Sequence, residues 1–158
     1  MSEEVRVYGN SVVEEPSGRT VIVSSMASDS HTWNLVYLEL LVRELGFDVV
    51  NLGACVPDEL LESECVSRRP AMLVLSSVNG HGYQDGLRVV QRLRAIPELR
   101  RLPIVIGGKL GTGGPLSDEQ TAELLFAGFD GVFDEQNAAA FRHFAATLPG
   151  GVTQLEGA

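Results

Sequence analysis

Five short hydrophobic segments alternate with segments of helical periodicity along most of this chain. The hydrophobic segments are rich in Val, Ile and Leu with little polar alternation, which is typical of strands buried on both faces. They read TVIVSSM, FDVVNLG, AMLVLSS, LPIVIGG and FDGVFD. Strands that alternate with helices are joined by right-handed crossovers into a parallel sheet with helices on both faces. The pattern therefore predicts a doubly wound, five-stranded α/β domain.

The segments between these strands carry the signals of helix ends. Leu35, Leu38 and Val42 recur at helical spacing within residues 32–45, and Gly46 follows as a C-cap. Four further helices are expected over residues 57–68, 84–96, 117–128 and 137–148.

The length of the chain indicates the number of domains, and its net charge disfavours some classes of binding partner. The chain has 158 residues and a formal net charge of −9, which fits one domain with an adequate core. An acidic surface repels phosphate groups, so neither nucleic acid nor a membrane is expected as a partner. No apolar run reaches the roughly 20 residues of a membrane span, and no signal-peptide pattern is visible. Because the two cysteines, Cys55 and Cys65, suit reduced thiols, we expect a cytoplasmic protein.

The pattern of hydrophobic residues also indicates where the folded domain begins and ends. Residues 1–18 mix charges, Gly and Pro without a clear period, and we expect an N-terminal extension there. Residues 19–150 are expected to form the domain, and residues 151–158 a C-terminal tail.

Three loops of the expected sheet share an unusual composition. In such sheets, ligands bind at the carboxyl ends of strands, near the point where the strand order reverses. The loops after the first, third and fourth strands read SMASDSHT, SSVNGHGYQ and GGKLGTGGP. All three are rich in Gly or Ser, which lets a ligand approach the backbone closely. We expect the binding site where these loops meet.

Asp29 and His31 lie one residue apart in the first of these loops. A carboxylate in this position can accept a hydrogen bond from one ring nitrogen and leave the other nitrogen free to bind a metal. Alternatively, Asp29 or Ser30 only caps the helix that follows. The spacing alone does not decide between these two interpretations.

The other two loops do not match the common catalytic or nucleotide-binding motifs. Ser76 and Ser77 can bond a heterocycle or phosphate, or only satisfy the last carbonyls of their strand. The fourth loop resembles a phosphate-binding loop in composition, but no Ser or Thr follows Lys109, and the spacing is not G-x-G-x-x-G. No G-x-S-x-G motif is present, and a phospho-acceptor receiver domain would end its third strand in Asp. These observations disfavour a nucleotide-binding protein, a serine hydrolase and a receiver domain.

Taken together, five motifs resemble the cobalamin-binding (small or sigma) subunit of glutamate mutase, also called methylaspartate mutase. SDSH matches the start of the D-x-H-x-x-G signature of that family. The motifs GFDVVNLG, LVLSSVNGHG, IVIGGKLGTGG and AGFDGVFD follow in the family's order and approximate spacing. The resemblance covers residues 20 to about 148.

The resemblance implies a flavodoxin-like domain of strand order 2-1-3-4-5 that binds adenosylcobalamin in the base-off/His-on form. It implies that His31 is the axial cobalt ligand and that Asp29 orients it. The displaced nucleotide tail would enter a cleft between the sheet and the first and last helices. The residues that the resemblance assigns to cofactor binding are Ser28, Asp29, Ser30, His31, Thr32, Ser76, Ser77, Val78, Lys109, Leu110, Gly111, Thr112 and Gly113.

The resemblance also implies a partner. In that family a separate TIM-barrel subunit binds the amino acid, and the cofactor's radical acts between the two chains. This chain would then be one subunit of a two-component isomerase, inactive alone. Alternative functions are a cobalamin-binding carrier or sensor module without isomerase activity, and a diverged interaction subunit that binds no cofactor.

The chain departs from the family pattern close to the histidine. Asn34 stands where the signature has glycine, and its side chain is expected to lie in the path of the tail. Trp33 precedes it, and is expected to stack on the tail, to plug the cleft or to pack in the core. Asn79 stands where the family usually has a bulky residue.

Overall fold

The computed structural model describes residues 19–134 and 137–148. The strands are β1 (Thr20–Ser24), β2 (Asp48–Gly53), β3 (Met72–Ser77), β4 (Ile104–Gly108) and β5 (Gly131–Asp134). The helices are α1 (Trp33–Glu44), α2 (Asp58–Arg68), α3 (Gly82–Arg94), α4 (Asp118–Ala127) and α5 (Ala138–Ala146), with a short 3₁₀ helix at Pro97–Leu99. The expected N-terminal extension (1–18) and C-terminal tail (151–158) lie outside the described residues.

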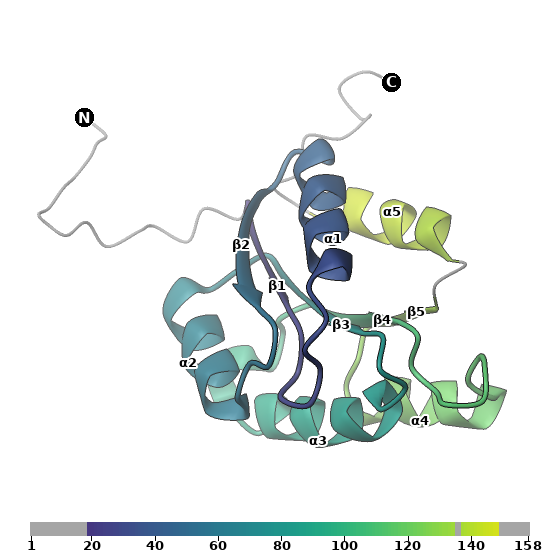
Figure 1. Cartoon of the computed structure of the whole chain (residues 1–158). Coiled ribbons are helices and arrows are strands. Elements are labelled where there is room, and N and C mark those ends of the chain that lie inside the picture. Colours follow the sequence, from purple (N-terminus) through teal and green to yellow (C-terminus); the bar gives the residue numbers. More distant parts are fainter. Residues whose placement is uncertain (1–18, 135–136, 149–158) are drawn as a thin grey trace, which may run out of the picture.

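The five strands form one parallel sheet in the order β2-β1-β3-β4-β5. This order and the alternation of strands with helices confirm the predicted flavodoxin-like, doubly wound fold (Figure 1). The strand order reverses between β1 and β3, because β1 leads to the outer strand β2 and β3 leads to β4.

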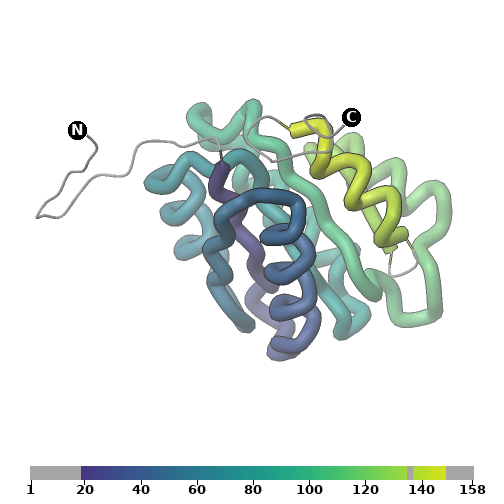
Figure 2. The backbone as a smooth tube through the Cα atoms, turned by 90° about the horizontal axis from the view of Figure 1, so that it is seen from above, coloured from purple at the N-terminus to yellow at the C-terminus, as the bar shows by residue number. Residues whose placement is uncertain are grey.

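Helices cover both faces of the sheet. Helices α1 and α5 lie on one face, and α2, α3 and α4 lie on the other (Figures 1 and 2). Strand β1 contributes to both cores, since Val21 and Val23 pack toward α1 and α5 while Ile22 packs on the opposite side. Successive residues of a strand point to opposite faces, so coverage on both sides explains why the strands are apolar throughout.

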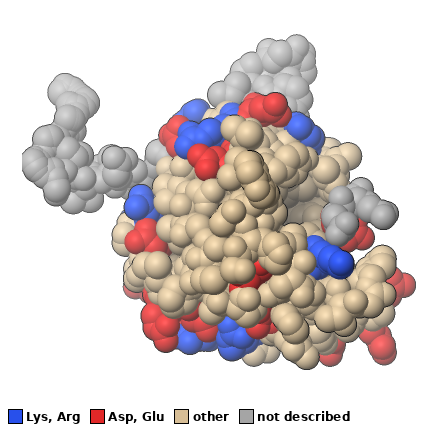
Figure 3. Space-filling view, in the orientation of Figure 1, with Lys and Arg blue, Asp and Glu red and all other residues tan. Residues whose placement is uncertain are grey.

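The face that carries α1 and α5 has few charged side chains across its middle (Figure 3). Among the large apolar side chains of α1, Trp33, Tyr37 and Leu40 are the most exposed. In the described part of the chain, no helix combines the length and apolar character needed to cross a membrane.

The carboxyl ends of β1, β3 and β4 meet at one edge of the sheet. Ser24 pairs with Leu75 across β1 and β3, and Ser77 pairs with Gly108 across β3 and β4. The three Gly- and Ser-rich loops therefore leave the sheet side by side.

Candidate cofactor-binding site

His31 lies in the loop between β1 and α1 and is held by Asp29. Its ring nitrogen Nδ1 lies 2.7 Å from Asp29 Oδ1, and its backbone N–H donates to the same oxygen at 3.0 Å. Asp29 is only 1% exposed, whereas the side chain of His31 is 57% exposed. The pair thus joins a buried carboxylate to an imidazole that is open to solvent.

The second carboxylate oxygen of Asp29 connects this loop to the end of β3. Oδ2 accepts hydrogen bonds from the backbone N–H groups of Val78, at 2.7 Å, and Asn79, at 3.2 Å. Burial alone would raise the pKa of Asp29, but the hydrogen bonds from His31, Val78 and Asn79 outweigh it, so the pKa lies below its ordinary value. The backbone N–H of Cys55, after β2, donates to the carbonyl oxygen of Asp29. Asp29 therefore joins the ends of three strands.

The ionisation of Asp29 fixes the tautomer of His31. An ionised carboxylate can only accept hydrogen bonds, so Nδ1 of His31 must carry the proton. In the neutral imidazole, Nε2 then has a free lone pair, and no described residue forms a hydrogen bond to it. This arrangement is compatible with metal binding through Nε2.

The start of α1 tests one of the two interpretations of Asp29, the helix cap. The helix begins at Trp33, and its N-cap residue Thr32 makes no side-chain cap hydrogen bond. Asp29 bonds to the backbone of His31 and to the loop after β3, so it does not cap α1. The capping interpretation is wrong for Asp29, and Ser30 does not cap the helix either.

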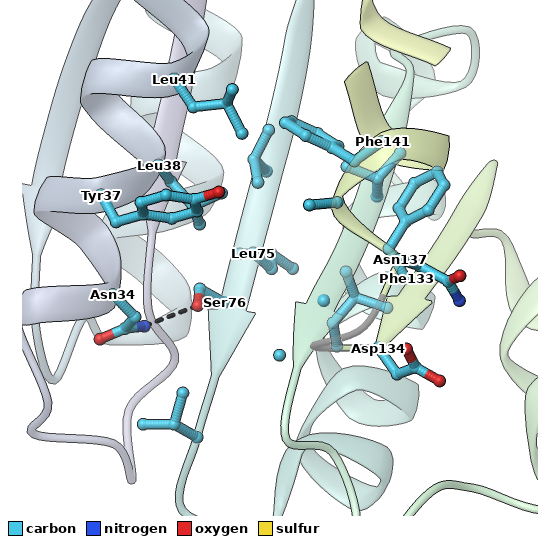
Figure 4. Close-up of a pocket in the computed structure, with 17 residues that line it drawn as sticks. Asn34, Tyr37, Leu38, Leu41, Leu75, Ser76, Phe133, Asp134, Asn137 and Phe141 are labelled. Atoms are coloured by element: carbon cyan, nitrogen blue, oxygen red, sulfur yellow. Dashed lines mark hydrogen bonds between the residues drawn. The ribbon is translucent and has the colours of Figure 1, made fainter. Parts of the chain in front are cut away.

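A cavity of about 280 Å³ lies between α1, α5 and the sheet. This is the position at which the resemblance predicts a cleft for the tail. Figure 4 shows its lining side chains, with α1 on one side, α5 on the other and β3 and β4 behind. The wall is mostly apolar, with Leu38 and Leu41 from α1, Val74 from β3 and Phe141 from α5. Its polar groups come from Asn34, Tyr37, Ser76, Asp134 and Asn137.

Asn34 bridges α1 and β3 at the wall of this cavity (Figure 4). Its Nδ2 group donates a hydrogen bond of 2.6 Å to Ser76 Oγ. The other amide atom, Oδ1, is buried and has no hydrogen-bond partner among the described residues. The side chain that replaces the signature glycine is therefore part of the cavity and is bonded to a residue assigned to the tail.

The structure excludes two of the three places that the sequence suggests for Trp33. Its side chain is 81% exposed, so it does not pack in the core. It also does not line the cavity, which excludes it as a plug.

The structure separates the two serines at the end of β3. Ser76 lines the cavity together with Val78, whereas Ser77 faces the opposite side of the sheet and donates a hydrogen bond to Asn79 Oδ1. The two-residue period of a strand explains this division. Ser28 likewise points away from the cavity, since its hydroxyl bonds to Asp85 in α3. Thr32 occupies the N-cap of α1, and Ser30 is exposed.

The loop after β4 lies next to the loop after β3. Thr112 packs against Gly80, at which an added Cβ atom would meet Thr112 Cγ2 at 3.0 Å. Lys109 and Leu110 line a second cavity of about 300 Å³, which shares Gly108 with the first. Gly111, Thr112 and Gly113 line neither cavity. The three loops therefore converge as predicted, but only part of the fourth-strand loop borders a cavity.

Gly108 brings β4 close to β3 at this edge. Its φ of +106° is in the region that favours glycine, and a Cβ atom there would lie 2.3 Å from the carbonyl oxygen of Ser77. A side chain at this position would push the loop after β4 away from the site.

Several cavity residues were not predicted as site residues from the sequence. They are Tyr37, Leu38, Leu41, Val74, Leu75, Val105, Ile106, Gly107, Gly108, Phe133, Asp134, Asn137, Ala138 and Phe141. Asn34 was expected in the path of the tail but was not assigned to cofactor binding. One signal was available for α1, because Asn34, Leu38 and Leu41 share a helical face. The contributions from β5 and α5 have no such signal, since they depend on how distant elements pack.

The site offers one histidine and no cluster of metal ligands. Within residues 19–134 and 137–148, no group of three or more His, Cys, Asp or Glu side chains could hold a metal ion. A metal at His31 would therefore need most of its ligands from another molecule. An exposed, oriented imidazole beside a largely apolar cavity fits a metal-containing cofactor with an organic appendage.

The fold and this site together define a class of protein, and comparison with known families agrees with it. The family model described as the B12 binding domain matches residues 19–142, and the chain belongs to this family. The chain is 31% identical to glutamate mutase sigma subunit 1 of Haloarcula marismortui, over 75% of this chain and 77% of that protein. It is 30% identical to the glutamate mutase sigma subunit of Halobacterium salinarum, over 87% of each chain.

Among solved structures, a cobalamin-binding protein from Desulfitobacterium hafniense superimposes with a TM-score of 0.61 at 21% identity. The match covers 79% of this chain but only 56% of that one, so the present chain spans little more than half of its length. This likeness supports the fold. The predicted family and a corrinoid as the class of cofactor are supported by the family match and the glutamate mutase relatives.

Proposed function

We propose that this chain is the cobalamin-binding subunit of an adenosylcobalamin-dependent carbon-skeleton mutase of the glutamate mutase type. It holds the corrinoid base-off, with Nε2 of His31 as the axial ligand of cobalt. The observation that carries the proposal is the exposed imidazole whose Nδ1 is fixed by the buried Asp29, beside a cavity between α1 and α5.

The residues present fit a corrinoid for a chemical reason. The corrin ring supplies four equatorial ligands to cobalt, so the protein needs to contribute one nitrogen, and His31 offers one. With His31 as a cobalt ligand, the cofactor's own base would need a place in the protein. The apolar wall formed by Leu41, Val74 and Phe141 suits a flat aromatic base.

The proposal assigns different roles to the cofactor, this chain and a partner chain. Bound adenosylcobalamin would supply a cobalt–carbon bond that cleaves homolytically and serves as the radical source. The residues of this chain bind the cofactor, orient it and adjust its axial ligand. The amino acid substrate is bound by a separate TIM-barrel subunit, and the two chains act together in the cytoplasm. The relatives in Haloarcula and Halobacterium are named sigma subunits, which supports a partner chain.

A cofactor titration tests the ligand role. Hydroxocobalamin added to the wild-type protein should give the visible spectrum of base-off binding, and His31→Ala should lose it. His143→Ala is the matched control, because His143 is an exposed histidine in the last turn of α5. Equal binding by wild type and His31→Ala would contradict the assignment of His31.

Isotope labelling identifies the ligand atom. The electron paramagnetic resonance spectrum of bound cob(II)alamin should show a three-line splitting from one axial ¹⁴N nucleus. Protein labelled with ¹⁵N should convert this to a two-line splitting if the nitrogen belongs to His31. A three-line pattern that persists would place the cofactor's own base on cobalt.

One observation favours a different function, a subunit that binds no cofactor. The Asn34 side chain occupies part of the cavity wall that a glycine would leave open. The absence of cobalamin uptake in the presence of a cognate TIM-barrel subunit, with wild-type protein and with Asn34→Gly, would establish that alternative. Uptake without any stimulation of mutase activity by the barrel subunit would instead indicate a carrier or a sensor.

A further inference from the structure

The side chain of Asn79 joins two of the loops that meet at the site. Its Nδ2 group donates hydrogen bonds to the carbonyl oxygen of Ser28, at 3.0 Å, and to Ser28 Oγ, at 3.2 Å. Its Oδ1 atom accepts from the backbone N–H of His81, at 2.9 Å, and from Ser77 Oγ, at 3.2 Å. Ser28 lies 51 residues before Asn79, in the loop between β1 and α1 (residues 25–32), here called the His31 loop.

The orientation of this amide is fixed by its backbone partners. A carbonyl oxygen only accepts hydrogen bonds, and a backbone N–H only donates one. Exchanging the two amide atoms would place the Asn79 oxygen against the Ser28 carbonyl and its NH₂ group against the His81 N–H. The bond between the two loops therefore runs from Asn79 to Ser28.

Only part of this arrangement is local. The bond from the His81 N–H to Asn79 Oδ1 closes an Asx turn, and α3 begins one residue later at Gly82. The bond to Ser28 is not needed for that turn. It holds the His31 loop instead.

The bond to Ser28 fixes the peptide group that leads into Asp29. The carbonyl oxygen of this group accepts from Asn79 Nδ2, and its N–H, which belongs to Asp29, donates to the carbonyl oxygen of Met26 at 3.1 Å. The backbone N–H of Asn79 also donates to Asp29 Oδ2. Asn79 therefore holds both the backbone before Asp29 and the carboxylate that orients His31.

Packing does little to hold this part of the loop. Ala27 and Ser28 are exposed at the tip of the turn, and segments with few buried contacts open easily. Among the described residues, Asn79 provides the one hydrogen bond to the Ser28 carbonyl, and Asp85 of α3 bonds only to the Ser28 hydroxyl.

We propose that Asn79 is a positioning residue that holds the His31 loop in its ligating geometry before a corrinoid binds. This inference rests on the proposed function, in which His31 ligates cobalt. A loop that is ordered in advance costs less entropy on binding, which raises affinity. The Asn79 side chain thus acts on the bond between His31 and cobalt, not on the nucleotide tail.

Hydrogen exchange of the cofactor-free protein tests the order of the loop. The backbone N–H groups of Asp29 and His31 are both hydrogen-bonded within it. Asn79→Ala should speed their exchange about tenfold, the effect of one hydrogen bond. Asn51→Ala is the matched control, because Asn51 is also half-buried and also makes two side-chain hydrogen bonds, but none to the His31 loop. It should leave the exchange of both groups unchanged.

A second variant separates the bond to Ser28 from the local turn. In Asn79→Ser, the hydroxyl can still accept from the His81 N–H, but this side chain is one atom shorter and does not reach Ser28. We expect the same faster exchange as in Asn79→Ala. Wild-type exchange in Asn79→Ser would mean that the turn alone orders the loop, which would overturn the inference.

The tautomer of His31 gives a readout that general stability does not change. At a pH at which the imidazole is neutral, ¹⁵N spectra of the cofactor-free protein should show the Nδ1–H tautomer in wild type and in Asn51→Ala. Asn79→Ala should show a mixture of tautomers, because Asp29 is no longer held in place. A pure Nδ1–H tautomer in this variant would contradict the role of Asn79.

Corrinoid affinity tests the consequence for ligation. Hydroxocobalamin carries the nucleotide tail and cobinamide lacks it, whereas the proposed function gives both the same ligand, His31. We expect Asn79→Ala to weaken the binding of both about tenfold, and Asn51→Ala to weaken neither. A loss confined to hydroxocobalamin would mean that Asn79 acts on the tail, and would overturn the inference.

The remaining outcomes separate this inference from the proposed function. If both corrinoids bind through His31 but Asn79→Ala changes neither exchange nor affinity, or changes exchange alone, the inference fails and the proposed function stands. Equal effects of Asn79→Ala and Asn51→Ala would also overturn the inference, since they would indicate general destabilisation. If neither corrinoid binds wild type in a manner that depends on His31, the proposed function fails, and the role of Asn79 in ligation fails with it.

Discussion

Asp29 is the residue on which the geometry of the site depends. Its carboxylate accepts hydrogen bonds from His31, Val78 and Asn79, and every one of these partners is a donor. An amide at the same position would turn an NH₂ group toward some of these donors. Two loops would then lose their connection, and the imidazole would lose the acceptor that fixes its tautomer.

We therefore predict that Asp29→Asn lowers the free energy of unfolding by about 1–3 kcal/mol, the cost of buried donors left unpaired. Urea denaturation measures this change. Asp48→Asn is the control, because Asp48 is exposed at the start of β2, and it should stay within about 0.5 kcal/mol of wild type. A similar small change in both variants would mean that the Asp29 network contributes nothing to stability.

The role of Asp29 beside His31 could not be predicted from the sequence alone, because the contacts that define it are with residues far along the chain. The sequence placed Asp29 and His31 in one loop and left two interpretations open. The deciding contacts of Asp29 are with Val78 and Asn79, which lie 49 and 50 residues away. Local spacing contains no information on such contacts. The same limit applied to Ser77, which was grouped with Ser76 although the strand period places it on the other face.

At the scale of elements, the loop after β4 depends on one glycine. Gly108 has a positive φ, and a Cβ atom there would meet the Ser77 carbonyl at 2.3 Å. We predict that Gly108→Ala destabilises the protein by about 3 kcal/mol or more, because it combines backbone strain with a clash against β3. Chemical denaturation measures the loss.

A neighbouring glycine provides the matched control. An added Cβ atom at Gly113 would meet no atom within 4 Å, so Gly113→Ala should change stability by no more than about 0.5 kcal/mol. If the two variants were equally stable, the close approach of β3 and β4 would not require glycine at residue 108.

The elements themselves were well predicted, since hydrophobic runs and helical spacing are local properties. The five strands and five helices occur close to their expected positions. Helix α3 begins at Gly82, two residues before the expected start. Gly82 packs so closely on Leu110 that an added Cβ atom would lie 2.6 Å from Leu110 Cδ2. The short 3₁₀ helix at Pro97–Leu99 was not predicted, since it contains no hydrophobic period.

At the scale of the molecule, buried or paired carboxylates hold distant elements together. Asp29 connects β1 to the loop after β3, and Asp58 connects α2 to α3 through Arg88 and Arg92. Hydrogen bonds from Arg88 lower the pKa of Asp58 despite its burial, and the pKa of Asp29 is also lowered. A carboxyl whose pKa is lower in the folded state stabilises the fold above its ordinary pKa of 3.8.

We therefore predict that these two groups give full stabilisation at neutral pH and that it declines as the pH falls below about 4. The decline continues until both carboxyls are protonated in the folded state. Urea denaturation at a series of pH values measures this profile. Asp29→Asn should have a shallower acid slope than wild type, and an identical slope would contradict the role given to this carboxyl.

The hydrophobic periodicity of the sequence did not predict the order of the strands in the sheet. Hydrophobic patterns predicted a parallel, doubly wound sheet, whereas the order 2-1-3-4-5 came from the family resemblance. Strand pairing is a contact between segments far apart in the sequence, and the buried strands β1, β3 and β4 are chemically alike. The cavity has the same origin, since its walls come from α1, three strands and α5.

The distant partners of Asp29 also have a consequence for the nascent chain. The ribosome completes the loop that contains His31 about 50 residues before it reaches Asn79. At about 5–20 residues per second, this interval lasts roughly 3–10 s. During that time the chain has its histidine but not the backbone donors that hold Asp29 in place. The hydrogen bonds from Val78 and Asn79 that hold Asp29 under the imidazole can therefore form only after β3 joins β1.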